Sequence, residues 1–199
     1  MNNILLVIDA QKIYSDPDSV LYCPEVHSTL EKINTLVRSF EERNKGIVFV
    51  RHMHLHDGSD TGRMYDFSGQ SDGTFNFVQG SDEVEFMDDL HRPITAMTIT
   101  KNRYSAFVNT DLSRLLTSLK ADTVTICGFM TQFCCESTAR DAHDRDFHVH
   151  FIVNATGNPG SPSRTQEEIR DMTGETLQEG FALVHRLDDF LSNATELLG

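Results

Sequence analysis

Short apolar runs rich in β-branched residues alternate with longer stretches of helical periodicity along the 199 residues of the chain. Several of the runs are apolar almost throughout, which is typical of strands buried on both faces of a parallel sheet. The pattern predicts strands at residues 3–8, 46–50, 96–100, 123–127, 148–153 and 181–185. It predicts helices at residues 25–44, 111–120, 132–145, 164–178 and 188–197.

This alternation indicates an α/β fold in three layers, with right-handed crossovers between parallel strands. The length suits one domain, residues 1–199, and no repeat or low-complexity linker divides it. One interval breaks the rhythm, because residues 52–94 separate two predicted strands and are rich in glycine and phenylalanine. Connections of this length are often functional, so we expect a lid or a wall of the active site there. A surface excursion packed on its own aromatic rings is the alternative.

Composition and charge restrict the partners of the chain. Its 39% hydrophobic and 24% charged residues are typical of a soluble globular protein. The formal net charge of −13 disfavours nucleic acid and anionic membranes, because both carry negative charge. The first residues, "MNNILLVIDAQ", lack the basic region and length of a signal peptide, and no segment approaches membrane-spanning length. We therefore expect a cytoplasmic protein with a small-molecule partner.

Two of the four cysteines are adjacent, in the stretch "GFMTQFCCESTARDA" at residues 128–142. The cysteines form neither a CxxC pair nor a zinc-type spacing, so reduced thiols are expected. Thr131 is a suitable N-cap, which places Cys134 in the first helical turn, where free amides and the helix dipole favour negative charge. With a cation nearby, such a thiol has a pKa of roughly 3.5–7.5. On these grounds a catalytic and a structural Cys134 are equally supported, whereas Cys135 and Cys127 are expected to be buried packing residues.

Chemically versatile residues follow four of the predicted strands. Asp9 and Gln11 follow the first strand, His52 the second, Lys101 the third and Cys134 the fourth. Ligands of open α/β sheets bind at the carboxyl ends of the strands. An acid, a cation and a thiol from separate strands are therefore expected to converge on one edge of the sheet.

Three separated motifs then indicate a family. They are "LLVIDAQ" at 5–11, "ITKNRYSAF" at 99–107 and "ICGFMTQFCCESTARDA" at 126–142. From the first strand to about residue 157, the chain resembles the isochorismatase-like hydrolases, which include nicotinamidases, N-carbamoylsarcosine amidases and isochorismatases. The resemblance implies a three-layer αβα, Rossmann-like fold with six mostly parallel strands, and a homo-oligomer. It implies a catalytic triad of Asp9, Lys101 and Cys134, an oxyanion hole from the backbone amides of Met130 and Cys134, and a cis peptide between Phe129 and Met130.

The resemblance also implies a reaction. Cys134 would attack an amide or carbamoyl carbon to form a thioester, with Asp9 as base and Lys101 stabilising the thiolate. Isochorismatases instead cleave a vinyl ether, which needs protonation by Asp9, and "KNRYSAF" and "ARDAHDRD" resemble that subgroup. A non-catalytic binding protein is a third hypothesis, which the intact triad disfavours. The expected substrate pocket comprises Gln11, His52, Tyr104, Phe107, Phe129 and Phe133.

The histidines of "RHMHLH", at positions 52, 54 and 56, alternate along an extended segment. Metal-binding nicotinamidases carry an aspartate and a histidine two residues apart in this region, but the later histidine spacing differs here. We therefore expect neither a metal ion nor another cofactor. His52 is then expected to line the pocket, with His54 and His56 partly exposed.

Overall fold

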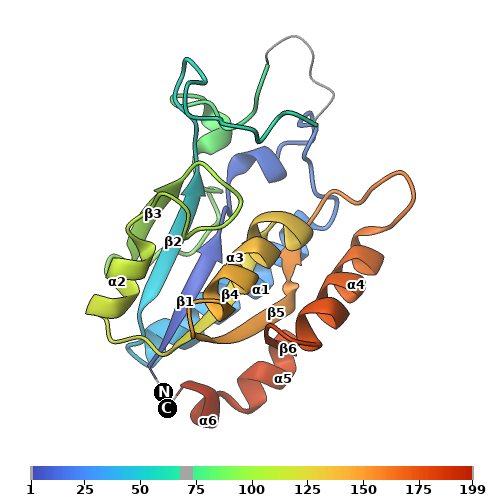
Figure 1. Cartoon of the computed structure of the whole chain (residues 1–199). Coiled ribbons are helices and arrows are strands. Elements are labelled where there is room, and N and C mark those ends of the chain that lie inside the picture. Colours follow the sequence, from blue (N-terminus) through green and yellow to red (C-terminus); the bar gives the residue numbers. More distant parts are fainter. Residues whose placement is uncertain (1, 68–73, 199) are drawn as a thin grey trace.

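Six parallel strands form one sheet in the computed structural model, which describes residues 2–67 and 74–198 (Figure 1). The strand order is β3-β2-β1-β4-β5-β6, and every neighbouring pair is parallel, as the apolar runs predict. The strands are β1 (Asn3–Ile8), β2 (Ile47–His52), β3 (Met97–Lys101), β4 (Thr123–Phe129), β5 (His148–Gly157) and β6 (Leu183–His185).

Helices cover both faces of the sheet, so the predicted α/β class and its layers are confirmed (Figure 1). They are α1 (Val26–Glu42), α2 (Leu112–Ser118), α3 (Glu136–His143), α4 (Gln166–Gln178), α5 (Leu187–Ser192) and α6 (Ala194–Leu198). Alternate residues of β1 serve the two faces. Leu5 and Val7 belong to a core cluster with α1, α5 and α6, whereas Leu6 and Ile8 belong to one with α2, α3 and α4.

Side-chain hydrogen bonds explain the differences between two of the predicted elements and the observed ones. The predicted helix 188–197 is split at Asn193, whose side chain donates to the carbonyl of Asp189 at 2.9 Å and competes with the helical ladder. The strand predicted to end at residue 153 continues to Gly157 as β5. Its last residues are polar but buried; the side chain of Asn154 accepts from the amide of Leu187 at 2.8 Å.

The strand order reverses between β1 and β4, and ligands of doubly wound sheets bind outside such a switch point. Asp9 follows β1 there, and a π turn labelled η3 (Thr131–Cys135) follows β4. The two strands approach so closely that a Cβ on Gly128 would lie 1.9 Å from the carbonyl oxygen of Ile8. Gly128 also has a φ of 121°, so only glycine fits this position.

The described residues of the connection, 52–67 and 74–94, lie over the carboxyl ends of β2 and β3, at the top of Figure 1. They include the short 3₁₀ turn η2 (Asp82–Val84), and backbone hydrogen bonds tie them to the sheet edge. Among them, the amide of Met53 donates to the carbonyl of Lys101 at 3.0 Å, and that of Met87 donates to the carbonyl of Ala10 at 3.0 Å. Residues 68–73 of this predicted lid lie outside the described residues. No helix in the described part of the chain is long and apolar enough to cross a membrane.

Candidate active site

Asp9, Lys101 and Cys134 meet at the carboxyl edge of the sheet. Asp9 directly follows β1, Lys101 ends β3, and Cys134 lies in η3 after β4. The ammonium nitrogen of Lys101 lies 2.7 Å from Oδ2 of Asp9 and 3.1 Å from Sγ of Cys134. Asp9 is fully buried and has a φ of 46°, an uncommon left-handed conformation found often at functional sites. The three residues that the sequence places on one edge are therefore in contact.

Lys101 reaches Asp9 across the end of β2, which lies between β1 and β3 in the sheet. His52 is the residue of β2 paired with Lys101, and its Nδ1 atom lies 3.0 Å from the lysine nitrogen. The lysine also donates to the carbonyl of Arg103 at 3.1 Å. Four acceptors thus surround an ammonium that has three N–H groups, so the ammonium is held on all sides.

His54 is buried, contrary to the expectation that it is partly exposed. Alternation along the segment puts it on the same face as His52, and the 52–94 connection covers that face. Its Nε2 atom lies 3.1 Å from Nε2 of His52, and its ring contacts Tyr65 and Phe75. His56 is exposed, as expected.

Gln11, predicted to line the pocket, is buried and connects three segments of the chain. Its side-chain nitrogen donates to the carbonyls of His52 at 2.9 Å and Val84 at 2.8 Å, and its oxygen accepts from the amide of His52 at 2.8 Å. Both ends of the side-chain amide are therefore engaged by the backbone. Gln11 therefore fixes His52 and η2 to the end of β1, and its place in the pocket lining stays a prediction.

The predicted aromatic pocket residues separate into two groups. Phe129 is fully buried and stacks on Tyr14, with ring centres 5.0 Å apart, and Phe107 packs in the core with Phe147. Both rings are buried in the core, so solvent does not reach them in this structure. Tyr104 and Phe133 are 38% and 39% exposed and stack on each other with ring centres 5.4 Å apart. These two lie next to the triad in sequence and stay candidates for substrate contact.

The turn that carries Cys134 begins differently from the predicted helix. Thr131 is not an N-cap; it is the first residue of η3, and its hydroxyl contacts that of Thr156 at 2.8 Å. The side-chain nitrogen of Asn158 donates to the same hydroxyl at 3.3 Å, so the end of β5 and the residue after it anchor the turn. Thr156 and Asn158 are not among the predicted site residues, although polar residues at the end of an apolar strand can indicate such an anchor. The peptide before Met130 is cis, as the resemblance implies.

The protonation of the triad differs from the expectation of a low-pKa thiol. Burial raises the pKa of Cys134 to about 12, against the lowering effect of the Lys101 ammonium. Burial also raises the pKa of Asp9, again opposed by Lys101. Burial lowers the pKa of Lys101, but Asp9 and Cys134 outweigh it and the net direction is upward. The resting thiol is therefore neutral beside a charged lysine, and a base must remove its proton.

Asp9, His52 and Cys134 each offer one potential metal ligand, and these atoms lie within 4.8 Å of one another. The centre of this group is taken by the Lys101 ammonium, which is in contact with all three side chains. A divalent cation there would face a positive charge at contact distance, which electrostatics strongly opposes. The residues present therefore do not fit a metal ion at this position.

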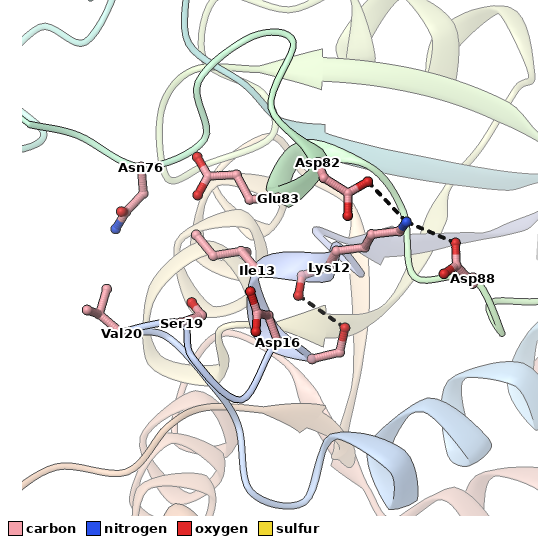
Figure 2. Close-up of a pocket in the computed structure, with 10 residues that line it drawn as sticks. Lys12, Ile13, Asp16, Ser19, Val20, Asn76, Asp82, Glu83 and Asp88 are labelled. Carbon is pink, nitrogen blue, oxygen red and sulfur yellow. Dashed lines mark hydrogen bonds and ion pairs between the residues drawn. The ribbon is translucent and has the colours of Figure 1, made fainter.

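A surface cavity of about 440 Å³ lies beside η2 and η1 (Lys12–Tyr14), and the triad does not line it (Figure 2). The ammonium of Lys12 points at Asp82 and Asp88, each at 3.1 Å, while Asp16 and Glu83 add further carboxylates. The cavity is thus strongly acidic and separate from the thiol chemistry.

Comparison with known proteins agrees with this geometry. The model of the isochorismatase domain matches residues 3–188. Nicotinamidase 3 of Arabidopsis thaliana is 29% identical over 180 residues, covering 89% of this chain and 81% of that protein. A crystal structure of a cysteine hydrolase from Pseudomonas syringae pv. phaseolicola is 26% identical with a TM-score of 0.89, covering 98% and 93% of the two chains.

N-carbamoylsarcosine amidase from Thermoplasma acidophilum shares the fold, with a TM-score of 0.74, 23% identity, and coverage of 94% of this chain and 98% of that one. The family model spans nearly the whole sheet, from β1 to the start of α5. Because the match is this extensive and the related proteins are hydrolases, the chain belongs to the isochorismatase family and is a hydrolase.

Proposed function

We propose that the protein is a cysteine hydrolase that cleaves the C–N bond of a small amide or carbamoyl compound through a thioester intermediate. The observation that carries the proposal is the buried thiol of Cys134, 3.1 Å from an ammonium that is itself 2.7 Å from the carboxylate of Asp9. A thiol next to a base and an orienting cation is the arrangement that nucleophilic catalysis needs. The amidase among the structural neighbours supports the fold of this proposal, and the nicotinamidase supports its reaction class.

Asp9 acts as the proton acceptor for the thiol. Both of its carboxylate oxygens are buried, and neither accepts a hydrogen bond of good geometry within the described residues; the contact with Lys101 is an ion pair. Burial raises the pKa of Asp9, although the ion pair with Lys101 opposes the shift, and a raised pKa fits the role of a base. Lys101 stays protonated and stabilises the thiolate as it forms.

The reaction then proceeds in two halves. Asp9 takes the thiol proton, the sulfur bonds to the carbonyl carbon, and the backbone amides of Met130 and Cys134 hold the oxyanion. The C–N bond breaks as Asp9 returns that proton to the leaving nitrogen, which departs as ammonia or an amine. Asp9 then deprotonates a water molecule that attacks the thioester. The C–S bond breaks, the acid product leaves, and the proton on Asp9 returns to the sulfur.

Tyr104 and Phe133 form the mouth of the proposed site, because they are the partly exposed aromatic residues adjacent to the triad. Burial raises the pKa of Tyr104, and Cys134 raises it further. The phenol therefore lies within electrostatic reach of the thiol. Two stacked rings at the mouth favour a small, planar substrate. His52, stacked on Phe77 with ring centres 4.4 Å apart, forms the floor beside Lys101.

Vinyl-ether hydrolysis is the second candidate, and one observation favours it. Burial raises the pKa of Asp9, which makes a protonated Asp9 easier to reach and suits a general acid. In that reaction Asp9 protonates the vinyl carbon and the thiol is not needed. Retention of a thiol in contact with Lys101 is unexplained by this route, so the amidase is preferred.

The proposal also covers the domain organisation, the 52–94 connection and the oligomeric state of the chain. Residues 1–199 form a single domain, and the 52–94 connection is the wall of the active site, held there by Gln11 and Phe77. A homo-oligomer in the cytoplasm stays a prediction from the family resemblance. Light scattering during size-exclusion chromatography measures the oligomeric state directly.

A substrate screen tests the proposed function. Purified protein is incubated with small aliphatic and aromatic amides, carbamoyl compounds and isochorismate, and released ammonia and pyruvate are measured separately. Ammonia from at least one amide or carbamoyl compound, absent with Cys134→Ala, is the expected result. Pyruvate from isochorismate that persists in Cys134→Ala would replace the amidase with the vinyl-ether reaction.

A further inference from the structure

A chain of polar contacts leads from the buried ammonium of Lys101 towards the surface. Nδ1 of His52 lies 3.0 Å from the lysine nitrogen, and Nε2 of His52 lies 3.1 Å from Nε2 of His54. On the other side of the second ring, Nδ1 of His54 lies 3.5 Å from Oδ1 of Asp60. Both histidines are buried, whereas the side chain of Asp60 is 19% exposed.

The donors and acceptors of this chain allow one consistent assignment. An ammonium only donates, so Nδ1 of His52 must accept from Lys101, and a neutral His52 then carries its proton on Nε2. That N–H faces Nε2 of His54, which must accept, so His54 carries its proton on Nδ1. The Nδ1 atom lies 3.5 Å from the carboxylate of Asp60 without hydrogen-bond geometry, so Asp60 attracts this N–H through its charge. The two histidines therefore hold opposite neutral tautomers.

Charge and packing keep both rings neutral and in place. Burial lowers the pKa of His52 well below its usual value, and Lys101, His54 and Arg103 lower it further. Burial also lowers the pKa of His54, with Arg103 and Lys101 contributing, although Asp60 opposes the shift. The buried carboxylate of Asp9 also faces the first ring, with its Oδ2 atom 3.9 Å from Nδ1 of His52.

Asp60 is itself held rigidly. Its Oδ1 accepts from the amide of Leu55 at 2.9 Å, and its Oδ2 accepts from the side chain of Asn102, next to Lys101, at 3.1 Å. Its backbone carbonyl accepts from Arg103 at 2.7 Å. The carboxylate thus joins the 52–94 connection to the loop that begins directly after Lys101, the last residue of β3.

We propose that His52, His54 and Asp60 form a positioning relay, which fixes one tautomer at each histidine and thereby holds the Lys101 ammonium against Sγ of Cys134. The effect of the relay on catalysis rests on the proposed function, whereas the assignment of the two tautomers does not. If His52 turned its protonated nitrogen to the lysine, an N–H would face an ammonium 3.0 Å away, and the lysine would leave the thiol. The charge of Asp60 disfavours that arrangement because it fixes the proton of His54 on Nδ1.

The first test reads the tautomers without any substrate. Protein labelled with ¹⁵N at histidine is examined by two-bond ¹H–¹⁵N correlation at about pH 7, and His52→Asn and His54→Asn assign the signals. We expect a bare Nδ1 with protonated Nε2 at His52, and the reverse at His54. The same tautomer at both residues, or an imidazolium at either, would overturn the relay even if the enzyme is an amidase.

The second test separates positioning from packing by comparing two variants at one position. His54→Phe keeps a ring beside Tyr65 and Phe75 but cannot accept from His52, whereas His54→Gln supplies an oxygen near the former Nε2. We expect His54→Phe to lower kcat about 10-fold and to change KM by less than about 2-fold. Loss of a residue that orients another site residue typically costs about 10- to 100-fold in activity. His54→Gln should recover most of kcat.

His56→Gln, in the exposed turn that follows His54, is the matched control and should leave kcat and KM unchanged. If no amide is turned over, the rate of iodoacetamide reaction at Cys134 replaces kcat, because Lys101 controls the thiol in either case. Equal losses in His54→Phe and His54→Gln, accompanied by equal falls in Tm, would show a merely structural role and overturn the proposal.

Discussion

Lys101 and Asp9 form a buried ion pair, with 2.7 Å between the ammonium nitrogen and Oδ2, although β2 separates their two strands in the sheet. The long lysine side chain crosses the end of β2, where His52 accepts one of its N–H groups. Charges buried in this way are stable only when they are paired and hydrogen-bonded. The pair therefore links catalysis to folding, and the variants of the site have to be examined for both.

Replacing the thiol tests the nucleophile. Cys134→Ala is expected to lower turnover by about 10³-fold or more, because the covalent route loses its attacking atom. Steady-state kinetics and Tm measure the two consequences, and Tm should change little because the side chain lost is small. Cys135→Ala removes an equally buried neighbour and should retain most activity. Near-normal amidase activity in Cys134→Ala would rule out the thiol mechanism.

The other two triad residues differ in their expected effect on stability. Lys101→Met leaves Asp9 as an unpaired buried charge and is expected to cost about 3–5 kcal/mol of unfolding free energy. Asp9→Asn should cost less, since Lys101 keeps Arg103, His52 and Cys134 as partners. Each should nearly abolish turnover, and the losses should not add to that of Cys134→Ala, because the three act as a unit. Urea unfolding and single and double variant kinetics check both statements, and additive kinetic losses would contradict the triad.

The sequence predicts the sheet well because its strands are continuous apolar runs, and such runs indicate burial on both faces. It places Asp9, Lys101 and Cys134 on one edge because parallel strands share their carboxyl ends. It does not predict the π turn at Thr131, since the hydroxyl of that residue could cap a helix or bond to a distant strand equally well. The burial of His54 escapes prediction for a related reason: it depends on the 52–94 connection, whose path no periodicity encodes.

The pKa of Cys134 is a further property that the local sequence predicts wrongly. A helix start and a cation favour a thiolate, but burial of Cys134 outweighs them and raises its pKa to about 12. Iodoacetamide should therefore react with Cys134 in the free enzyme at a rate that rises about tenfold per pH unit between roughly pH 6 and 9, because the thiolate fraction rises so. Peptide mapping should find Cys134 labelled before Cys135, which is fully buried. A rate that is already at a plateau at about pH 6 would restore the low-pKa thiolate.

Metal removal tests the argument that the Lys101 ammonium fills the only ligand cluster found among the described residues. Dialysis against a strong chelator is expected to change kcat and KM by less than about 2-fold, because thiolate attack with an amide oxyanion hole needs no Lewis acid. Elemental analysis of the dialysed protein provides the control. Reversible loss of activity, restored by zinc or iron, would instead make ligands of His52 and His54, whose Nε2 atoms are 3.1 Å apart.

Acid sensitivity should arise far from the active site, at a pair of histidines on the β5–β6 edge. His150 is buried on β5, its Nδ1 lies 2.9 Å from Nε2 of His185, and its ring packs against Phe190. Burial, with a contribution from His185, lowers the pKa of His150 to about 4. An unfolded histidine has a pKa of about 6.5, so between these values the unfolded chain binds a proton that the folded chain does not.

Stability should therefore be full above about pH 6.5 and fall as the pH drops towards 4, since protonation then favours the unfolded chain. Urea midpoints at about pH 7 and pH 5 measure the fall. His150→Leu removes the titrating group and should make the fall shallower, while His52 and His54, whose pKa values are also lowered by burial, keep part of it. His148→Leu changes an exposed histidine of the same strand, which contributes less than burial and His185 to the lowered pKa of His150, and should change the slope only slightly. If His150→Leu had the same slope as the parent protein, the acid sensitivity would have to be assigned to the histidines beside Lys101 alone.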